Sequence, residues 1–145
     1  MKVLIALDES AVSIRAAREA HRLFPQGEFL VVNVGRRRVP WLAGGEYGVV
    51  YPADTAYFVN DGLDDSELTA LAEAAGLEPV DVLTAFGDPA DVICDAAERH
   101  DADVVVVGSH DKGVLRRLIE PSVAQAVVQG TYRPVLVVSG TPPTP

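Results

Sequence analysis

Five short runs of apolar residues, separated by stretches of helical character, constrain the fold of this chain more than any other feature. The runs are Val3–Leu7, Phe29–Val34, Val80–Phe86, Val104–Val107 and Val135–Val138. Most are apolar at nearly every position rather than at alternate ones, which is typical of strands covered on both faces in a parallel sheet. The run Val80–Phe86 (VDVLTAF) comes closest to alternating, so we expect it to be an edge or half-covered strand.

Helical patterns fill the connections between these runs. The first, residues 10–24, follows a possible cap at Ser10. Its inward stripe is expected to be Ala16, Ala20, Leu23 and Phe24, and its outward face to carry Arg15, Arg18 and Arg22. The others are Leu63–Ala75 before Gly76, a helix opened by Asp88 and Pro89, and one from about Ser122 to Gln129 before Gly130. This alternation predicts an α/β three-layer sandwich with right-handed crossovers and helices on both faces of the sheet.

The length of 145 residues predicts one domain, which we place at residues 1–140. Residues 36–62 form an insertion that is longer than ordinary connections. The insertion contains the only tryptophan, Trp41, and three of the four tyrosines, so we expect it to pack somewhere rather than to act as a free linker. Residues 141–145 are expected to fray.

Composition excludes several classes of partner. The chain has 12 basic and 21 acidic residues, a net charge of −9, which argues against binding to nucleic acid or to an anionic membrane. The single cysteine, Cys94, cannot close an intramolecular disulfide and is expected to be a small core residue. A reducing, cytoplasmic location is therefore expected, and the short apolar start of the chain predicts neither a signal peptide nor a membrane span.

A binding crevice is expected where the carboxyl ends of the strands meet, because open parallel sheets hold ligands at the point where strand order reverses. If the first and fourth runs are neighbours, Asp8 and the sequence Gly108-Ser109-His110 face the same crevice. We interpret Asp8 as a helix cap or a ligand to a sugar hydroxyl rather than as a catalytic acid. His110 has no nucleophile beside it in the sequence, so we interpret it as a polar contact.

Taken together, motifs along nearly the whole chain resemble those of the universal stress protein family. They are a hydrophobic strand before Asp8, Gly-Asp-Pro at 87–89, Gly-Ser-His at 108–110, Ser122-Val123, and Pro134 before the last apolar run. The resemblance implies a Rossmann-like, adenine-nucleotide-hydrolase-like fold with a five-stranded parallel sheet in the order 3-2-1-4-5. It also implies homodimers that form through the last strand, here Val135–Ser139. In the ATP-binding members, the position of Asp8 contacts the nucleoside and the backbone near Val34 meets the adenine.

The ATP-binding motif of that family is degenerate in this chain. One subclass binds ATP through Gly-x-x-Gly, nine residues, and Gly-Ser or Gly-Thr; the other lacks the motif and does not bind ATP appreciably. Here the three glycine positions hold Gly108, Asp111 and Pro121, followed by Ser122. Asp111 brings a carboxylate toward a polyanion, and like charges about 4 Å apart repel by about 1 kcal/mol in water and about 4 kcal/mol at an effective dielectric constant of 20. Pro121 has no N–H to donate to phosphate.

Other residues favour nucleotide binding. Positive charge comes from Lys112, Arg116 and Arg117, and Ser122 with Val123 offers a hydroxyl and an amide at a helix N-terminus. The candidate nucleotide-binding residues are therefore Asp8, Val34, Gly108, Ser109, His110, Lys112, Gly113, Ser122 and Val123. No residues are spaced as a metal site or as a catalytic group.

Three functions remain open on this reading. The favoured one is a homodimeric stress-response or regulatory module that uses no cofactor and does not bind ATP appreciably. The second is an ATP-binding or nucleotide-binding stress switch with weak or altered phosphate contacts, for which slow hydrolysis stays possible. The third is a scaffold for a protein partner through the aromatic insertion. A dedicated enzyme is not expected, because neither a Gly-x-x-x-x-Gly-Lys-Ser/Thr loop nor a Gly-x-Ser-x-Gly elbow occurs.

Overall fold

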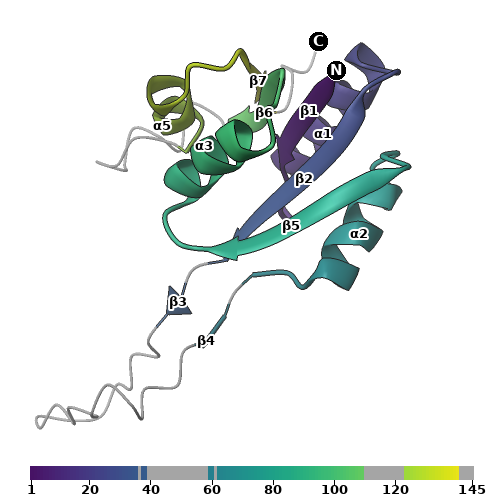
Figure 1. The fold of residues 1–145 in the computed structure, drawn as a ribbon. Helices are drawn as coiled ribbons and strands as arrows, with labels where there is room; N and C mark the ends of the chain where they lie inside the picture. Colours follow the sequence, from purple (N-terminus) through teal and green to yellow (C-terminus); the bar gives the residue numbers. More distant parts are fainter. Residues whose placement is uncertain (36, 39–58, 61, 110–122, 141–145) are drawn as a thin grey trace, which may run out of the picture.

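One parallel sheet organises the molecule. The computed structural model describes residues 1–35, 37–38, 59–60, 62–109 and 123–140. The strands of the sheet are β1 (Lys2–Ala6), β2 (Glu28–Gly35), β5 (Val80–Phe86), β6 (Val104–Ser109) and β7 (Val135–Ser139). They lie in the order β5-β2-β1-β6-β7, all parallel (Figure 1). Numbered along the chain, this is the order 3-2-1-4-5 that the family resemblance implies, so the predicted fold class is confirmed.

Helices cover both faces of this sheet, which confirms the three layers. They are α1 (Ala11–Leu23), α2 (Asp65–Ala74), α3 (Pro89–Arg99) and α5 (Val123–Gly130). The buried side chains of α1 and α2 share one apolar cluster with alternate residues of the sheet. Those of α3 and α5 share a second cluster on the opposite face. Among the described helices, none is long and apolar enough to cross a membrane.

The centre of the core is β1, the middle strand of the five. Val3 and Ile5 face the α1 and α2 layer, and Leu4 faces the α3 and α5 layer. All three side chains are at most 1% exposed. Complete burial of a side chain of this size contributes about 1.5 to 3 kcal/mol, so this strand must be apolar on both faces.

Short-range signals set the helix ends. The Ser10 hydroxyl caps α1 by accepting the amide N–H of Ser13 at 3.3 Å. Asp64 and Glu67 form a reciprocal capping box at the start of α2. Gly76 follows α2 with φ +93°, a conformation that glycine adopts without steric strain. Asp88 caps α3, with Pro89 in its first turn, as the sequence predicts.

Some sequence predictions about the helices are wrong in detail. Leu23 does not lie on the buried stripe of α1; it is 44% exposed, and small residues at Ala16, Ala17 and Ala20 let the helix pack closely instead. Helix α2 begins at Asp65 rather than at Leu63, because Asp64 is its cap. Helix α5 runs from Val123 through Gly130, so the glycine belongs to the last turn instead of following it.

A short antiparallel ribbon joins the two ends of the predicted insertion. It consists of β3 (Arg37–Arg38) and β4 (Val59–Asn60), which pair with each other. The ribbon leaves the molecule beyond the carboxyl ends of β2 and β5 (Figure 1). We call β3, β4 and the flanking Gly35 and Gly62 the arm base. Most of the insertion and the predicted tail at 141–145 lie outside the described residues.

Candidate functional site

The sheet brings Asp8 and Gly108 to the same end, where the strands finish at their carboxyl termini. Strands β1 and β6 are parallel neighbours, with Val3 opposite Val104 and Ile5 opposite Val106. Asp8 follows β1, and Gly108 with Ser109 ends β6, so the loops that leave these two strands start side by side. This is the point where strand order reverses, because the chain moves from β1 to β2 on one side and reaches β6 on the other.

Asp8 holds together the turn that starts α1. Its Oδ1 accepts the N–H of Ser10 at 2.8 Å and the hydroxyl of Ser13 at 2.7 Å. Its own N–H donates to the Ser13 oxygen at 3.0 Å. A carboxylate beside the first turn also interacts favourably with the positive end of the helix dipole. Asp8 thus has a structural role in capping, while its exposed position leaves it within reach of a ligand.

Gly108 is explained by packing between β6 and α1. A methyl group added at this position would lie 2.9 Å from the carbonyl oxygen of Val12 and 3.1 Å from its Cγ2. The first distance is shorter than real Cβ contacts allow and the second is tight, so any larger residue would push α1 away from the sheet. The neighbouring Ser109 lies opposite Ser139 of β7.

Val34 ends the buried part of β2 on the α3 and α5 side. Its side chain is half-buried, packs against the second apolar cluster and lies opposite Ala85 of β5. The residue before it, Asn33, is one of only two polar side chains that are buried in the described part of the chain. Sequence reasoning missed Asn33, although a lone amide within the run FLVVNV is a signal that a buried polar partner exists.

The remaining nucleotide-binding candidates fall in two groups. Val123 is the first residue of α5 and is 37% exposed. Four of them, His110, Lys112, Gly113 and Ser122, lie outside the described residues, as do Asp111 and Pro121. The structure therefore describes the β1 and β2 sides of the expected crevice and the beginning of its β6 side.

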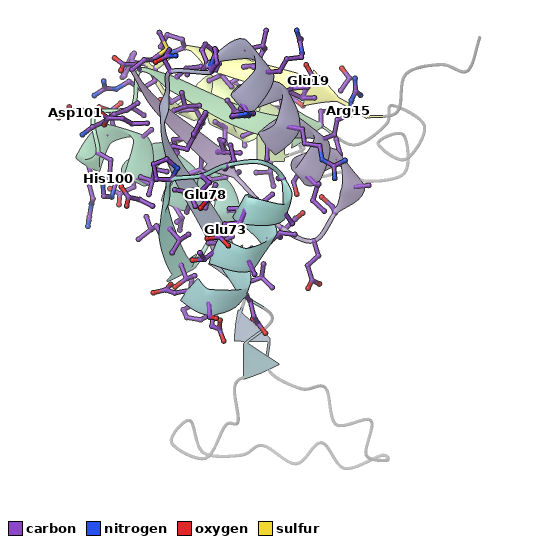
Figure 2. All side chains as sticks on the ribbon, turned by 90° about the vertical axis from the view of Figure 1, so that its right-hand side faces the viewer. Arg15, Glu19, Glu73, Glu78, His100 and Asp101 are labelled. Carbon is purple, nitrogen blue, oxygen red and sulfur yellow. The ribbon has the colours of Figure 1, made fainter. Side chains whose placement is uncertain are left out.

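Arg15 lies on α1 near the end of β7 (Figure 2). It does not turn outward as predicted; its guanidinium donates to the carbonyl oxygen of Ser139 at 2.6 Å and to that of Gly140. Arg15 therefore links α1 to the carboxyl end of β7 and to the residue that follows it.

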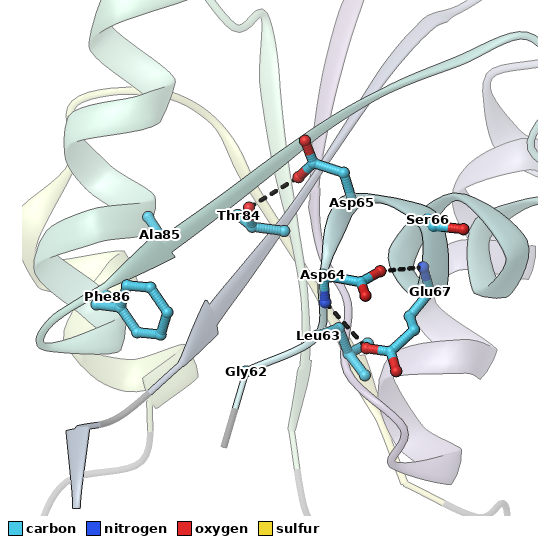
Figure 3. Close-up of a pocket in the computed structure, with 9 residues that line it drawn as sticks. All are labelled: Gly62, Leu63, Asp64, Asp65, Ser66, Glu67, Thr84, Ala85 and Phe86. Atoms are coloured by element: carbon cyan, nitrogen blue, oxygen red, sulfur yellow. Dashed lines mark hydrogen bonds between the residues drawn. The ribbon is translucent and has the colours of Figure 1, made fainter. Parts of the chain in front are cut away.

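A shallow groove of about 660 Å³ lies at the opposite side of the sheet, between α2 and the end of β5 (Figure 3). Its walls are Gly62, Leu63, Asp64, Asp65, Ser66, Glu67, Thr84, Ala85 and Phe86. Its acidic side chains are already engaged: Asp64 and Glu67 cap α2, and Asp65 accepts the Thr84 hydroxyl at 2.8 Å. The groove is separated from Gly108 by β2 and β1 and is not the crevice predicted from the sequence.

Cys94 is a packing residue between α3 and α5. Its Sγ lies 3.9 Å from the carbonyl oxygen of Val127. Burial raises the pKa of the Cys94 thiol, and the charges of Asp91 and Glu98 raise it further. The neutral thiol is therefore favoured in the folded protein, which opposes nucleophilic reactivity. No group of three or more His, Cys, Asp or Glu side chains among the described residues is arranged to hold a metal ion.

Comparisons with known proteins agree with this architecture. The sequence model described as the universal stress protein family matches residues 1–139. A universal stress protein of Methanocaldococcus jannaschii is 27% identical over 94% of this chain and 81% of its own length. The fold is similar to that of a universal stress protein solved in complex with cAMP, with a TM-score of 0.62, 20% identity, and coverage of 95% of this chain and 96% of the other. It is also similar to the universal stress protein from Archaeoglobus fulgidus in complex with dAMP, with a TM-score of 0.54, 21% identity, and coverage of 95% and 97%.

Proposed function

Because the chain belongs to the universal stress protein family, we propose that it is a stress-response or regulatory module that catalyses no reaction and does not bind ATP appreciably. The three glycine positions of the ATP-binding pattern hold Gly108, Asp111 and Pro121. At the second position a glycine would let the backbone approach phosphate closely, whereas the Asp111 carboxylate repels it. At the third position Pro121 lacks the N–H group that a glycine would donate.

The packing of Gly108 is the observation that carries this proposal. The one glycine that remains is required by the contact of β6 with the Val12 carbonyl, at 2.9 Å from an added methyl group. Its presence therefore needs no bound phosphate as an explanation.

A nucleotide with a single phosphate is the second candidate ligand. The two relatives described above were solved with cAMP and with dAMP, which carry one phosphate each. A shorter anion avoids much of the repulsion from Asp111, and Asp8 can still accept a hydrogen bond from a sugar hydroxyl. This function is a nucleotide-dependent switch with altered phosphate contacts.

Isothermal titration calorimetry separates the two functions. The proposed module gives no heat with millimolar ATP and magnesium, and none with AMP. Heat with AMP but not with ATP supports the single-phosphate candidate, whereas micromolar binding of ATP contradicts the proposed module and supports an ATP-binding switch. The variant with both Asp111→Gly and Pro121→Gly restores the glycine pattern and is expected to gain ATP affinity. Adding Asp8→Ala to it serves as a control, because binding in the expected crevice must then weaken.

We further propose that the protein is a cytoplasmic homodimer formed through β7. This strand is at one edge of the sheet, so half of its backbone groups lack a strand partner. Val137 on it is 41% exposed, and the nearby Tyr132 is fully exposed. Pairing of two β7 strands across a two-fold axis satisfies these backbone groups and covers the valine. The lone thiol of Cys94 is compatible with a reducing compartment.

A further inference from the structure

Asn33 connects two chain segments at the carboxyl end of the sheet, one at Leu7 and one at Leu63. Its side chain is 5% exposed and lies near the end of β2. The Nδ2 group donates to the carbonyl oxygen of Leu7 at 2.9 Å. The Oδ1 atom accepts the N–H of Leu63 at 3.0 Å. Leu7 directly precedes Asp8, and Leu63 directly follows Gly62 of the arm base.

The orientation of the Asn33 amide matches both partners. The carbonyl of Leu7 can only accept, and the N–H of Leu63 can only donate, so the side chain must present a donor on one side and an acceptor on the other. A buried amide that lost either partner would leave an unsatisfied group, which is strongly unfavourable. The N–H of Leu7 also donates to the Val32 carbonyl at 3.0 Å, so β2 holds both polar groups of that residue. Leu7 cannot move unless Asn33 moves with it.

The arm base lies next to the Leu63 end of the hydrogen-bonded link Leu7–Asn33–Leu63. A methyl group added to Gly62 would lie 2.9 Å from the Cα of Gly35 and 3.5 Å from the Oδ1 of Asn33. The two chain segments therefore approach too closely for a side chain at Gly62, and the amide oxygen of Asn33 lies at ordinary contact distance beside them. Any displacement of β4 that moves Gly62 moves Leu63 as well, and so changes the hydrogen bond to Asn33.

We propose that Asn33 is a positioning residue that couples the arm base to the Asp8 turn. Displacement of the arm base is transmitted through Leu63, Asn33 and Leu7 to the residues that hold the start of α1. This coupling does not depend on a nucleotide.

A double-mutant cycle with amide hydrogen exchange tests the link. The four proteins are the native chain, Gly62→Ala, Asn33→Leu, and the double variant. In the native background, Gly62→Ala is expected to speed exchange at Asp8 and Ser10 about fivefold relative to Val105 in the core, comparable to the loss of one hydrogen bond. In the Asn33→Leu background, Gly62→Ala is expected to leave exchange at Asp8 and Ser10 unchanged, because the link is already broken.

Two results would overturn the coupling. One is an effect of Gly62→Ala on Asp8 and Ser10 that is equally large in both backgrounds, since the signal would then bypass Asn33. The other is no effect on these amides in the native background. Gly130→Ala is the matched control, because its methyl group meets Cys94 Sγ at 3.2 Å on the opposite face and must not alter the Asp8 turn.

Substitute variants keep the test decisive if a protein fails to fold. Gly35→Ala replaces Gly62→Ala, since its methyl group would lie 2.9 Å from the Cα of Gly62; it would also lie 2.8 Å from Cε1 of Phe86, whose ring must move aside. Asn33→Asp at pH 8 replaces Asn33→Leu; it keeps an acceptor for Leu63 but removes the donor to Leu7. With these variants, the same two results would overturn the coupling.

Discussion

The two edges of the sheet are built differently. The exposed side chains of β5 include a charge, Asp81, which is the second residue of the strand. Helix α2 is joined to the same strand by the hydrogen bond between Asp65 and Thr84. The other edge strand, β7, is uncharged throughout and exposes Val137. A charge on an edge opposes pairing with another sheet, whereas an apolar edge permits it. The difference indicates that the molecule has one edge available for association and one that is guarded.

The largest effect is expected when a charge is placed on the buried side of β7. Val138 is 8% exposed and belongs to the core shared with α1 and α2. Val138→Lys should lower the free energy of unfolding by about 4 kcal/mol or more, because an unpaired charge is buried. Urea denaturation measures this loss. A loss below about 1 kcal/mol would show that this side of β7 opens to solvent.

A charge on the exposed side of β7 should break the proposed dimer and leave the fold intact. Val137→Lys places two like charges near the two-fold axis and is expected to raise the dimer dissociation constant about 100-fold. Analytical ultracentrifugation measures the constant. Val128→Lys on α5 is the matched control, since Val128 is 50% exposed but is not on the edge strand. An unchanged dimer in Val137→Lys would place the association surface elsewhere.

Removal of the charge from β5 should open the second edge. Asp81→Val is expected to produce species larger than the dimer at high concentration, with a change in unfolding free energy within about 1 kcal/mol. Multi-angle light scattering across a concentration series detects them. Asp81→Lys keeps a charge at this position and should remain at the native size. A purely dimeric Asp81→Val would mean that α2, rather than the charge, protects β5.

Loss of the Arg15 side chain should loosen the end of β7. Arg15→Ala removes the donors to the carbonyl oxygens of Ser139 and Gly140 and is expected to lower stability by about 1 kcal/mol. Faster hydrogen exchange at Ser139 relative to Val106 reports the loosening. Arg18→Ala, an exposed position on the same helix, provides the comparison. Equal effects of both variants would assign the loss to helix propensity alone.

The smallest effect is expected where β5 is tied to α2. Thr84→Val keeps the shape of the side chain but removes the hydroxyl that donates to Asp65 at 2.8 Å. The bond is exposed, so the expected loss is about 0.5 kcal/mol, measured by thermal unfolding. Thr69→Val removes a hydroxyl bond within α2 and serves as a reference. A larger loss of stability from Thr84→Val would show that this hydrogen bond is a main contact holding α2 against β5.

Much of this architecture could be predicted because the relevant forces act over short stretches of chain. Strands buried on both faces must be continuously apolar, and the partial alternation of Val80–Phe86 correctly predicted an edge. Ser10 and Asp88 were recognisable as caps because each bonds an amide three residues ahead.

The unpredicted features depend on contacts between distant residues. The partners of Asn33 are 26 and 30 residues away, and the carbonyl groups that bind Arg15 are 124 and 125 residues away. The pairing of β3 with β4 joins segments too short to show any periodicity. The expected site followed from topology at Asp8 and Gly108, whereas the structural roles of both residues became visible only from their neighbours in space.

The central place of β1 also constrains how the protein is made. One of its two partners, β6, lies about one hundred residues further along the chain. During translation, one side of β1 therefore stays unpaired until β6 has been synthesised. A nascent chain that ends before Val104 lacks this partner, so the central pairing of the sheet is expected to form only after β6 emerges.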